Sequence, residues 1–311
     1  MDVACVQDVH GVYHYTEFYV KFKNMIVDQS ALAFVGLGVD GLIFPSTSNA
    51  APSSSGIDSR QSDSESGPDV LRMSMLAEKD AHNSFIPPTE PLWVTFYVNG
   101  KEIENIKAYI GLGQLLYFYN PETQQSALSP SQTDFSHFRV HMGRNKVHCI
   151  HTPSGSSIRF DIYLYNLRDN LVVMDIDGTI TRSDLTGYIQ TVYLGLYSYI
   201  HDGIVDFLHT LQTKHHLKFI YLTSRPMGHR KETINFLKGV QRVTGRGGER
   251  GLPPGPLFTA KTRLMVALYK EVVTRETASI KASMLQQVVD IFRRGGDIRP
   301  SPIVAGWGNK V

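Results

Sequence analysis

The sequence has few cysteines, little charge imbalance and no long apolar run. Cys5 and Cys149 are the two cysteines in 311 residues, which excludes a small secreted scaffold built on disulfides. The 31 basic residues against 29 acidic ones give a net charge of +2, so we expect no general nucleic-acid binding. The longest mostly apolar stretch, residues 31–44, contains Asp40 and is shorter than the ~18 residues that a membrane-spanning helix requires. The first twenty residues lack the basic start and apolar run of a secretory signal. These absences predict a soluble intracellular protein.

Hydrophobic residues make up 42% of the chain and charged residues 19%, a balance that permits a packed core. Residues 46–68 are an exception, because this Ser-rich segment has almost no apolar side chain to bury. Such a segment cannot offset its ordering entropy. We therefore predict a disordered insert, which extends to about residue 90.

The first half of the chain has the alternating pattern of short β-strands. An Asn99-Gly100 pair after one apolar run is a strong hairpin signal. Helical periodicity is not visible here. The predicted strands are 17–23, 93–98, 106–110, 115–119, 138–142, 147–151 and 157–165. Many short strands separated by turn residues predict a β-sandwich over residues 1–168.

From residue 171 onward, strands alternate with helices. Continuous apolar runs at 171–174, 219–222 and 303–305 are typical of strands buried on both faces. Between them we predict a helix capped by Asp202-Gly203, a helix at 231–240, a loop at 245–256, and two amphipathic stretches at 264–272 and 284–292. This alternation predicts a parallel sheet over residues 169–311.

The first chemical feature is the sequence DIDGT at residues 175–179, at the end of a predicted buried strand. In an open parallel sheet, ligands bind beyond the carboxyl ends of the strands. There, Asp175 can attack phosphorus to form an acyl-phosphate. Asp177 can protonate the leaving oxygen and later deprotonate water. Gly178 permits a sharp turn, and we expect Thr179 to hold it by a local hydrogen bond.

Three further features follow in order. Thr223, Ser224 and Arg225 end the second apolar run, where a hydroxyl and backbone N–H groups can seat a phosphate and an arginine can pair with phosphate or a carboxylate. We expect Lys281 at a helix start, where it can supply a cation for phosphoryl transfer. Asn309 follows the last apolar run, and its amide oxygen is a ligand type that suits Mg²⁺.

Each feature alone has a plainer explanation. Asp-x-Asp occurs in ordinary strand-end turns, a Thr-Ser-Arg sequence can cap a helix, and a lone lysine is usually a surface residue. A glycine-rich segment near Asn309 is also compatible with a simple loop. The order of the features along one α/β pattern favours a phosphoryl-transfer site.

This ordered series resembles the haloacid dehalogenase superfamily. The stretch DIDGTIT followed by Ser183-Asp184, with YLTSR downstream, is similar to the lipins, which are Mg²⁺-dependent phosphatidate phosphatases. The similarity covers residues 157–311, and a weaker similarity to the amino-terminal lipin region occurs at 18–22 and 98–113. The resemblance implies an α/β haloacid-dehalogenase-like (Rossmannoid) catalytic domain. It also implies an N-terminal immunoglobulin-like β-sandwich, in which amino-terminal strands pair with strands just before the catalytic domain.

Carried over position by position, the resemblance implies a role for each motif residue. Asp175 becomes the nucleophile and Asp177 the general acid and base, with Lys281 stabilising the nucleophile and the phosphoryl charge. Thr223 binds the phosphate. The remaining substrate-binding residues are Gly178, Thr179, Ser224 and Arg225. The implied Mg²⁺ ligands are Asp175, Asp177 through its backbone carbonyl, and Asn309.

The implied activity is hydrolysis of phosphatidate to diacylglycerol and phosphate in glycerolipid synthesis. The resemblance also implies a cytoplasmic protein that is peripheral at the endoplasmic reticulum or nuclear membrane, or a protein located in the nucleus. The sequence departs from the family in two places. The lipin motif around Asn309 continues to an aspartate, whereas this sequence stops at Val311, so we expect a C-terminal truncation and weaker Mg²⁺ binding. The chain also begins without a clear amphipathic helix for membrane contact.

Two alternatives stay open. The first is a catalytically impaired, phosphatidate-binding lipin-like module; the paired aspartates argue against it, and the missing acid argues for it. The second is a superfamily phosphatase that acts on a soluble phosphoester, against which the predicted sandwich argues.

Overall fold

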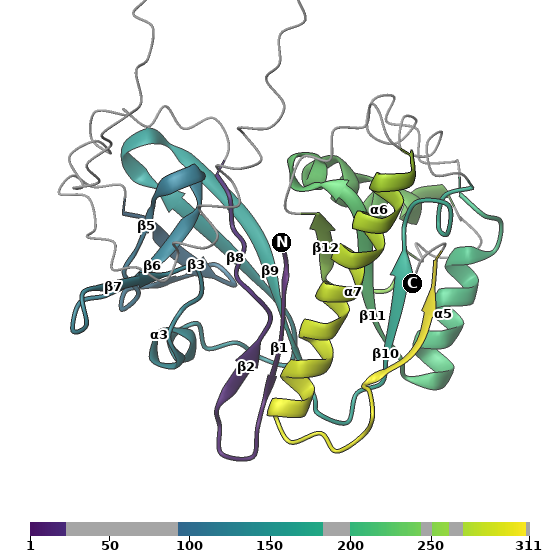
Figure 1. Ribbon diagram of the computed structural model, residues 1–311, viewed down its shortest axis with the longest axis horizontal. Coiled ribbons are helices and arrows are strands. Elements are labelled where there is room, and N and C mark those ends of the chain that lie inside the picture. Colours follow the sequence, from purple (N-terminus) through teal and green to yellow (C-terminus); the bar gives the residue numbers. More distant parts are fainter. Residues whose placement is uncertain (23–92, 183–199, 244–250, 261–269, 309–311) are drawn as a thin grey trace, which may run out of the picture.

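The computed structural model describes residues 1–22, 93–182, 200–243, 251–260 and 270–308 (Figure 1). The predicted insert at 46–90 lies outside these ranges, as does Asn309. None of the helices within the described ranges is both long and apolar enough to cross a membrane.

Two β-sheets form the first part of the molecule. The larger sheet has the strand order β2-β1-β9-β8-β3-β4, and the smaller one has the order β5-β6-β7. The larger sheet comprises β1 (Val3–Gln7), β2 (Tyr13–Tyr15), β3 (Thr95–Val98), β4 (Lys101–Ile103), β8 (Gly143–His151) and β9 (Ser156–Tyr165). The smaller sheet comprises β5 (Ala108–Ile110), β6 (Leu116–Asn120) and β7 (Gln125–Ala127), with the short 3₁₀ turn η2 (Leu112–Gln114) between β5 and β6. A second 3₁₀ turn, η3 (Thr152–Ser154), connects β8 and β9 of the larger sheet.

A core rich in phenylalanine joins the two sheets. Phe18, Phe96 and Phe118 are buried in it, with β-branched residues of both sheets around them. Phe18 meets Phe118 edge-to-face at 5.6 Å between ring centroids, a favoured aromatic geometry. The predicted hairpin turn is confirmed, because Asn99 and Gly100 have positive φ angles of 52° and 83° between β3 and β4.

The predicted strand at 17–23 is wrong over its described part, residues 17–22. The predicted apolar side chains are buried, but the backbone forms an isolated bridge between Lys21 and Leu115 in place of a strand. The alternation of apolar and polar residues indicates which side chains face the core. It does not show whether the backbone is hydrogen-bonded to a neighbouring strand.

The predicted strand at 138–142 is also wrong, and a helix was missed before it. Residues Gln132–His137 form the helix α3, which begins at a capping box made by Ser131 and Asp134. In the loop after α3, the buried Asn145 side chain accepts from the His141 N–H at 2.9 Å and donates to the His141 carbonyl at 2.7 Å. These backbone groups are therefore satisfied by a side chain in place of a neighbouring strand. Six residues are too few for a helical period to be visible in the sequence.

The second part of the molecule contains the predicted parallel sheet, so the chain has an α/β fold there. The strand order is β12-β11-β10-β13, and all neighbouring pairs are parallel. The strands are β10 (Leu171–Asp175), β11 (Lys218–Pro226), β12 (Leu257–Ala260) and β13 (Ile303–Trp307). The helices are α5 (Ile204–His215), α6 (Arg230–Val243) and α7 (Lys270–Arg294), with the 3₁₀ turn η4 (Met227–His229) before α6.

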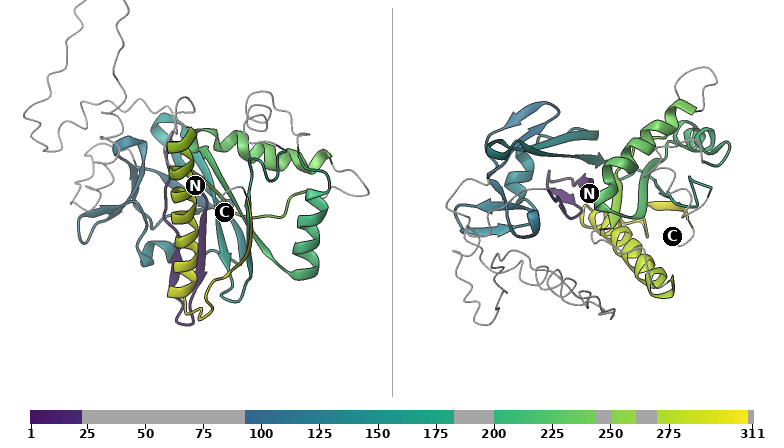
Figure 2. Two further views of the ribbon diagram at one scale, coloured as in Figure 1. Left: turned by 45° about the vertical axis from the view of Figure 1, so that its right-hand side comes forward. Right: turned by 90° about the horizontal axis from the view of Figure 1, so that it is seen from above.

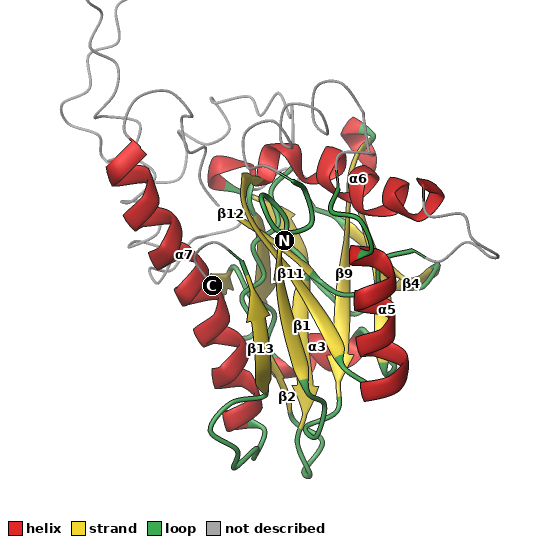
Figure 3. Ribbon diagram, turned by 90° about the vertical axis from the view of Figure 1, so that its right-hand side faces the viewer, coloured by secondary structure: helices red, strands yellow, loops and turns green. Residues whose placement is uncertain are grey.

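Alternate residues of these strands face opposite helices. Val172 and Phe219 belong to the core that α5 and α6 cover, whereas Val173 and Ile220 belong to the core beneath α7. Figure 3 shows α7 on one side of the sheet and α5 and α6 on the other. Strands that are buried on both faces explain the continuous apolar runs in the sequence.

Two details of the helices differ from the prediction. The predicted stretches at 264–272 and 284–292 were separate, but one helix, α7, runs continuously from Lys270; residues 261–269 lie outside the described ranges. Gly203 is the N-cap of helix α5, as predicted, but no side-chain hydrogen bond caps the helix. Asp202 lies one position before the N-cap and pairs with Arg182 at 2.8 Å on the surface.

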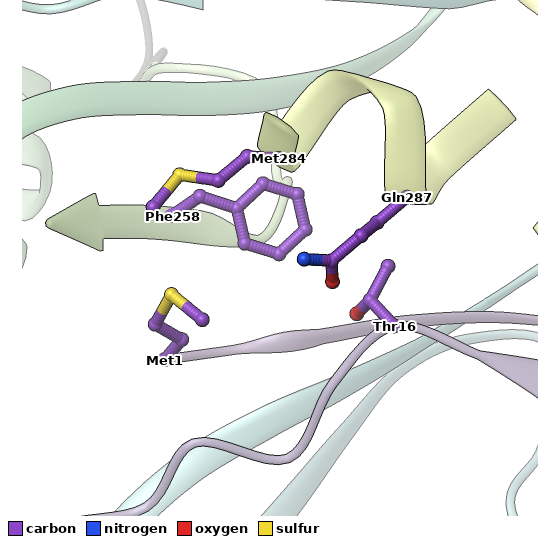
Figure 4. Close-up of a pocket in the computed structure, with 5 residues that line it drawn as sticks. All are labelled: Met1, Thr16, Phe258, Met284 and Gln287. Carbon is purple, nitrogen blue, oxygen red and sulfur yellow. The ribbon is translucent and has the colours of Figure 1, made fainter. Parts of the chain in front are cut away.

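Strands β1 and β9 lie between the two parts of the molecule. They pair in parallel, with Val3 opposite Ile162, and the face that carries Ala4 and Tyr163 packs in one core with β10, β11 and α7. In Figure 2, the yellow-green helix α7 lies beside the purple amino-terminal strands. Figure 4 shows the same contact closely: a small cavity lies between the amino-terminal segment, β12 and α7, and its lining residues are Met1, Thr16, Phe258, Met284 and Gln287.

Candidate active site

Asp175 lies at the carboxyl end of β10, where the order of the parallel strands reverses between β11 and β13. Such a switch point is where ligands bind in open α/β sheets. Asp175 is 3% exposed. One carboxylate oxygen accepts from the Ile176 N–H at 3.0 Å, and the other accepts from the Lys281 ammonium at 2.5 Å.

Lys281 is the buried cation of the site. It is 5% exposed and reaches Asp175 from α7, across the face of the parallel sheet. The prediction placed it at a helix start, but α7 begins eleven residues earlier, so the helix N-terminus does not explain its position. Burial raises the pKa of Asp175 above its ordinary value, and the hydrogen bond and charge of Lys281 oppose that rise.

A tight turn follows Asp175. Gly178 has a φ of 75°, which favours glycine. The turn is held by Thr181, whose hydroxyl accepts from the Gly178 N–H at 3.0 Å and donates to the Ile176 carbonyl at 3.3 Å. The sequence predicts that the Thr179 hydroxyl holds the turn, but the Thr179 side chain makes no hydrogen bond within the described residues. Thr181 fits because its position in the turn places its hydroxyl against both backbone groups.

The Asp177 carboxylate is held by Arg225. The arginine Nε donates to both carboxylate oxygens at 3.0 Å, and its Nη2 donates to one of them at 2.6 Å. The Thr223 hydroxyl donates to the same carboxylate at 3.0 Å and accepts from the Arg225 N–H at 3.1 Å. The sequence predicts that Arg225 pairs with a phosphate or with a carboxylate. In the structure, Arg225 pairs with the Asp177 carboxylate.

The Arg225 side chain is itself fixed on its far side. It is 3% exposed, and its Nη1 donates to the Thr233 hydroxyl at 3.4 Å. The guanidinium carbon lies 5.7 Å from the centre of the Phe236 ring, within cation–π range. Neither Thr233 nor Phe236 was predicted as a site residue, because a helix that follows a strand carries no motif that marks them.

The structure therefore gathers most of the predicted residues at one edge of the sheet: Asp175, Asp177, Gly178, Thr179, Thr223, Ser224, Arg225 and Lys281. Ser224 is partly buried, and its side chain makes no hydrogen bond among the described residues. Asn309 lies outside the described residues. Trp307 pairs with Met174 in register, so β13 leads toward the strand end that carries Asp175.

Oxygen ligands for a Mg²⁺ ion are present at this edge. The Asp175 carboxylate and the Asp177 backbone carbonyl are hard oxygens of the kind that Mg²⁺ prefers. Within the part of the chain that the structure describes, no group of three or more His, Cys, Asp or Glu residues is placed to hold a metal. The predicted ligand set does not depend on such a group, because it combines one carboxylate with a backbone carbonyl and an amide.

Several curated proteins are similar to this chain. The fission-yeast (Schizosaccharomyces pombe) protein named nuclear elongation and deformation protein 1 is 32% identical over 49% of this chain and 22% of its own length. The human phosphatidate phosphatase LPIN1 is 34% identical over 48% of this chain and 15% of its own length. The Saccharomyces cerevisiae phosphatidic acid phosphohydrolase 1 is 27% identical over 45% of this chain and 16% of its own length. The matched region thus spans less than a quarter of these relatives.

A family model matches a longer stretch. The model described as LNS2 (Lipin/Ned1/Smp2) matches residues 126–311, which is more than half of the chain and contains every predicted site residue. The chain therefore belongs to the LNS2 (Lipin/Ned1/Smp2) family and is a lipin-family protein.

Proposed function

We propose that this chain is a Mg²⁺-dependent phosphatidate phosphatase that hydrolyses phosphatidate to diacylglycerol and inorganic phosphate. The observation that supports this most strongly is the buried pair of Asp175 and Lys281 at the switch point of the sheet. The names of several relatives state the same activity. We further propose that the parallel sheet is a haloacid-dehalogenase-type catalytic domain (169–311), and that the two β-sheets form an immunoglobulin-like sandwich (1–168).

In the first step, an oxygen of the Asp175 carboxylate attacks phosphorus and the bond between phosphorus and the glycerol oxygen breaks. Asp177 gives a proton to that leaving oxygen, which becomes the hydroxyl of diacylglycerol. In the second step, Asp177 removes a proton from water, and the water oxygen attacks phosphorus. The bond between phosphorus and the Asp175 oxygen breaks, so inorganic phosphate leaves and the Asp175 carboxylate is restored.

Lys281 stabilises negative charge on Asp175 and on the transferring phosphoryl group, because a fixed cation in a poorly solvated site interacts strongly with developing charge. Gly178, Thr179, Thr223 and Ser224 are the proposed phosphate contacts. Asp175, the Asp177 carbonyl and Asn309 are the residues that would hold a Mg²⁺ ion, which would further neutralise the phosphoryl charge.

Asp177 and Arg225 need a change of partner for this chemistry. A carboxylate in an ion pair only accepts hydrogen bonds, so the acid step requires that Asp177 exchange Arg225 for a proton. A dianionic phosphoryl group competes well for a guanidinium. We infer that substrate binding loosens this pair, which gives Arg225 its place among the substrate-binding residues.

Phosphatidate is a membrane lipid, so we propose that the chain acts at the surface of the endoplasmic reticulum or nuclear membrane, from the cytoplasm or the nucleus. The name of the fission-yeast relative, nuclear elongation and deformation protein 1, supports a nuclear connection.

The test is phosphate release from phosphatidate vesicles at millimolar Mg²⁺, beside vesicle flotation. We expect Mg²⁺-dependent release that Asp175→Asn abolishes while flotation is unchanged. Flotation with phosphatidate but no release by the unaltered chain would favour the lipid-binding module instead. Faster turnover of small sugar phosphates than of phosphatidate would favour the soluble phosphoester phosphatase.

A further inference from the structure

Asp2 is a buried carboxylate that has no part in the proposed chemistry. It is 3% exposed. Its carboxylate accepts from the Asp161 N–H at 2.8 Å and from the Leu257 N–H at 2.9 Å, and it forms an ion pair with Arg230. These three donors belong to β9, β12 and α6. Figure 1 shows the amino-terminal end of the chain between β9 and β12.

Arg230 attaches the start of α6 to the larger β-sheet. It is the first residue of the helix, and its side chain is 15% exposed. One terminal nitrogen of the guanidinium pairs with Asp2, and the other donates to the Arg159 carbonyl of β9 at 3.1 Å. Charge-assisted contacts with little solvent exposure are stronger and more directional than surface ion pairs. The first turn of α6 is thereby fixed from the side of Asp2.

The same turn contacts the candidate active site. Thr233 is fully buried, and its hydroxyl donates to the His229 carbonyl at 2.9 Å and accepts from Arg225 at 3.4 Å. The other nitrogens of that guanidinium bind Asp177. Because a guanidinium is planar and rigid, its contact with Thr233 helps to fix the plane in which it meets Asp177.

We propose that Asp2 is a positioning residue for the phosphoryl transfer. Through Arg230 and the first turn of α6, it fixes Thr233, and Thr233 in turn holds the Arg225 guanidinium beside Asp177, where the guanidinium meets the incoming phosphoryl group. This inference rests on the proposed function. It makes the amino-terminal segment a part of the catalytic apparatus, although Asp2 contacts no reacting atom.

The first test compares Asp2→Asn with Arg144→Gln. The amide keeps the size of the side chain and can accept from one of the two backbone N–H groups, but it loses the charge that holds Arg230. Arg144 is the control, because it pairs with Asp161 of the same sheet at 2.7 Å and makes no hydrogen bond with α6 among the described residues. Turnover of p-nitrophenyl phosphate, a soluble substrate that needs no membrane, is measured well below the melting temperature of each variant.

We expect kcat to fall about tenfold in Asp2→Asn with KM within about twofold, because small misplacements of catalytic groups lower the rate strongly. Arg144→Gln should change kcat less than about twofold even if its melting temperature falls equally. Equal kcat values per folded molecule in the two variants would overturn the proposal.

Thr233 provides a second test that leaves Asp2 and Arg230 intact. Thr233→Val should lower kcat about as much as Asp2→Asn, and Thr233→Ser, which keeps the hydroxyl, should restore it. If the effect passes through Thr233, the double variant Asp2→Asn/Thr233→Val should be no slower than either single variant. Losses that multiply in the double variant would overturn the proposed path.

Hydrogen exchange separates this inference from the proposed function, because it requires no turnover. The backbone amides of residues 223–236 should exchange faster in Asp2→Asn than in Arg144→Gln. If the unaltered chain hydrolyses no phosphomonoester, the proposed function fails, and this comparison alone decides whether Asp2 fixes the Arg225 region. Equal exchange rates in both variants would overturn the proposal that Asp2 fixes the Arg225 region.

Discussion

Lys281 and Asp175 are 106 positions apart in the sequence and 2.5 Å apart at the end of β10. Both are nearly fully buried, so neither charge is compensated by water. Breaking such a pair leaves one uncompensated charge in the interior, which costs far more than loss of a surface ion pair. The pair therefore links the stability of the site to its chemistry.

Replacing Lys281→Met should lower phosphate release by about 100-fold or more, because a cation beside the nucleophile is lost. It should also lower the unfolding free energy by about 3 kcal/mol, since Asp175 is left unpaired. Phosphate release and denaturant unfolding measure the two effects.

The double variant Asp175→Asn/Lys281→Met separates these effects. It contains no uncompensated charge, so it should regain stability and remain inactive. Lys231→Met, on the exposed face of α6, is the control and should change neither quantity. An active double variant would contradict the assigned roles.

Replacing Arg225→Lys should lower kcat by about tenfold or more despite the conserved charge. An ammonium cannot reproduce the forked contact with Asp177 and also reach Thr233. Arg182→Lys is a matched control, because Arg182 pairs with the exposed Asp202. Steady-state kinetics of both variants are the measurement, and equal kcat values would show that the geometry around Asp177 does not matter.

Gly255→Ala should destabilise the fold. A Cβ at this position would lie 2.3 Å from the Phe219 carbonyl oxygen of β11, closer than atoms can approach without a backbone shift. We expect a loss of about 1–3 kcal/mol in unfolding free energy. Gly228→Ala, where a Cβ meets no atom within 4 Å, should be nearly neutral. Equal melting temperatures of the two variants would disprove the close approach.

We expect the ion pair of Asp297 with Arg299 to make the stability of the protein depend on pH. The hydrogen bonds from Arg299 hold the pKa of this carboxyl below its ordinary value. A lowered pKa in the folded state stabilises the protein above the unfolded-state pKa, and the contribution disappears as the pH falls through the folded-state pKa. Asp297→Asn should therefore lower the unfolding free energy by about 1 kcal/mol at pH 7. The difference should shrink from pH 5 toward pH 3; a constant difference would exclude the ion pair as its cause.

The parallel sheet and the grouping of the motif residues were predictable from local patterns. Runs such as 171–174 and 219–222 are apolar on both faces because helices cover both faces of this sheet. Since parallel strands end at a common edge, the residues after two such runs, Asp175 and Thr223, had to lie near each other.

Contacts between distant segments were not predictable in this way. Strand β1 was missed because Val3 to Val6 are all buried, half of them toward each of two cores, so its sequence does not alternate. The partners of Asp2 depend on how β1 packs against β9. No local sequence pattern predicts that Asp2 pairs with Arg230, which lies 228 positions away. The partner of Arg225 remained undecided for the same reason.

In the proposed mechanism, Asp175 becomes covalently phosphorylated during turnover. Acid quenching of the protein during turnover of phosphatidate, followed by borohydride reduction, converts an aspartyl-phosphate into homoserine. Peptide mass spectrometry should then find homoserine at position 175, dependent on both substrate and Mg²⁺, and none in Asp175→Asn. Sustained phosphate release with unmodified Asp175 under the same conditions would contradict the account.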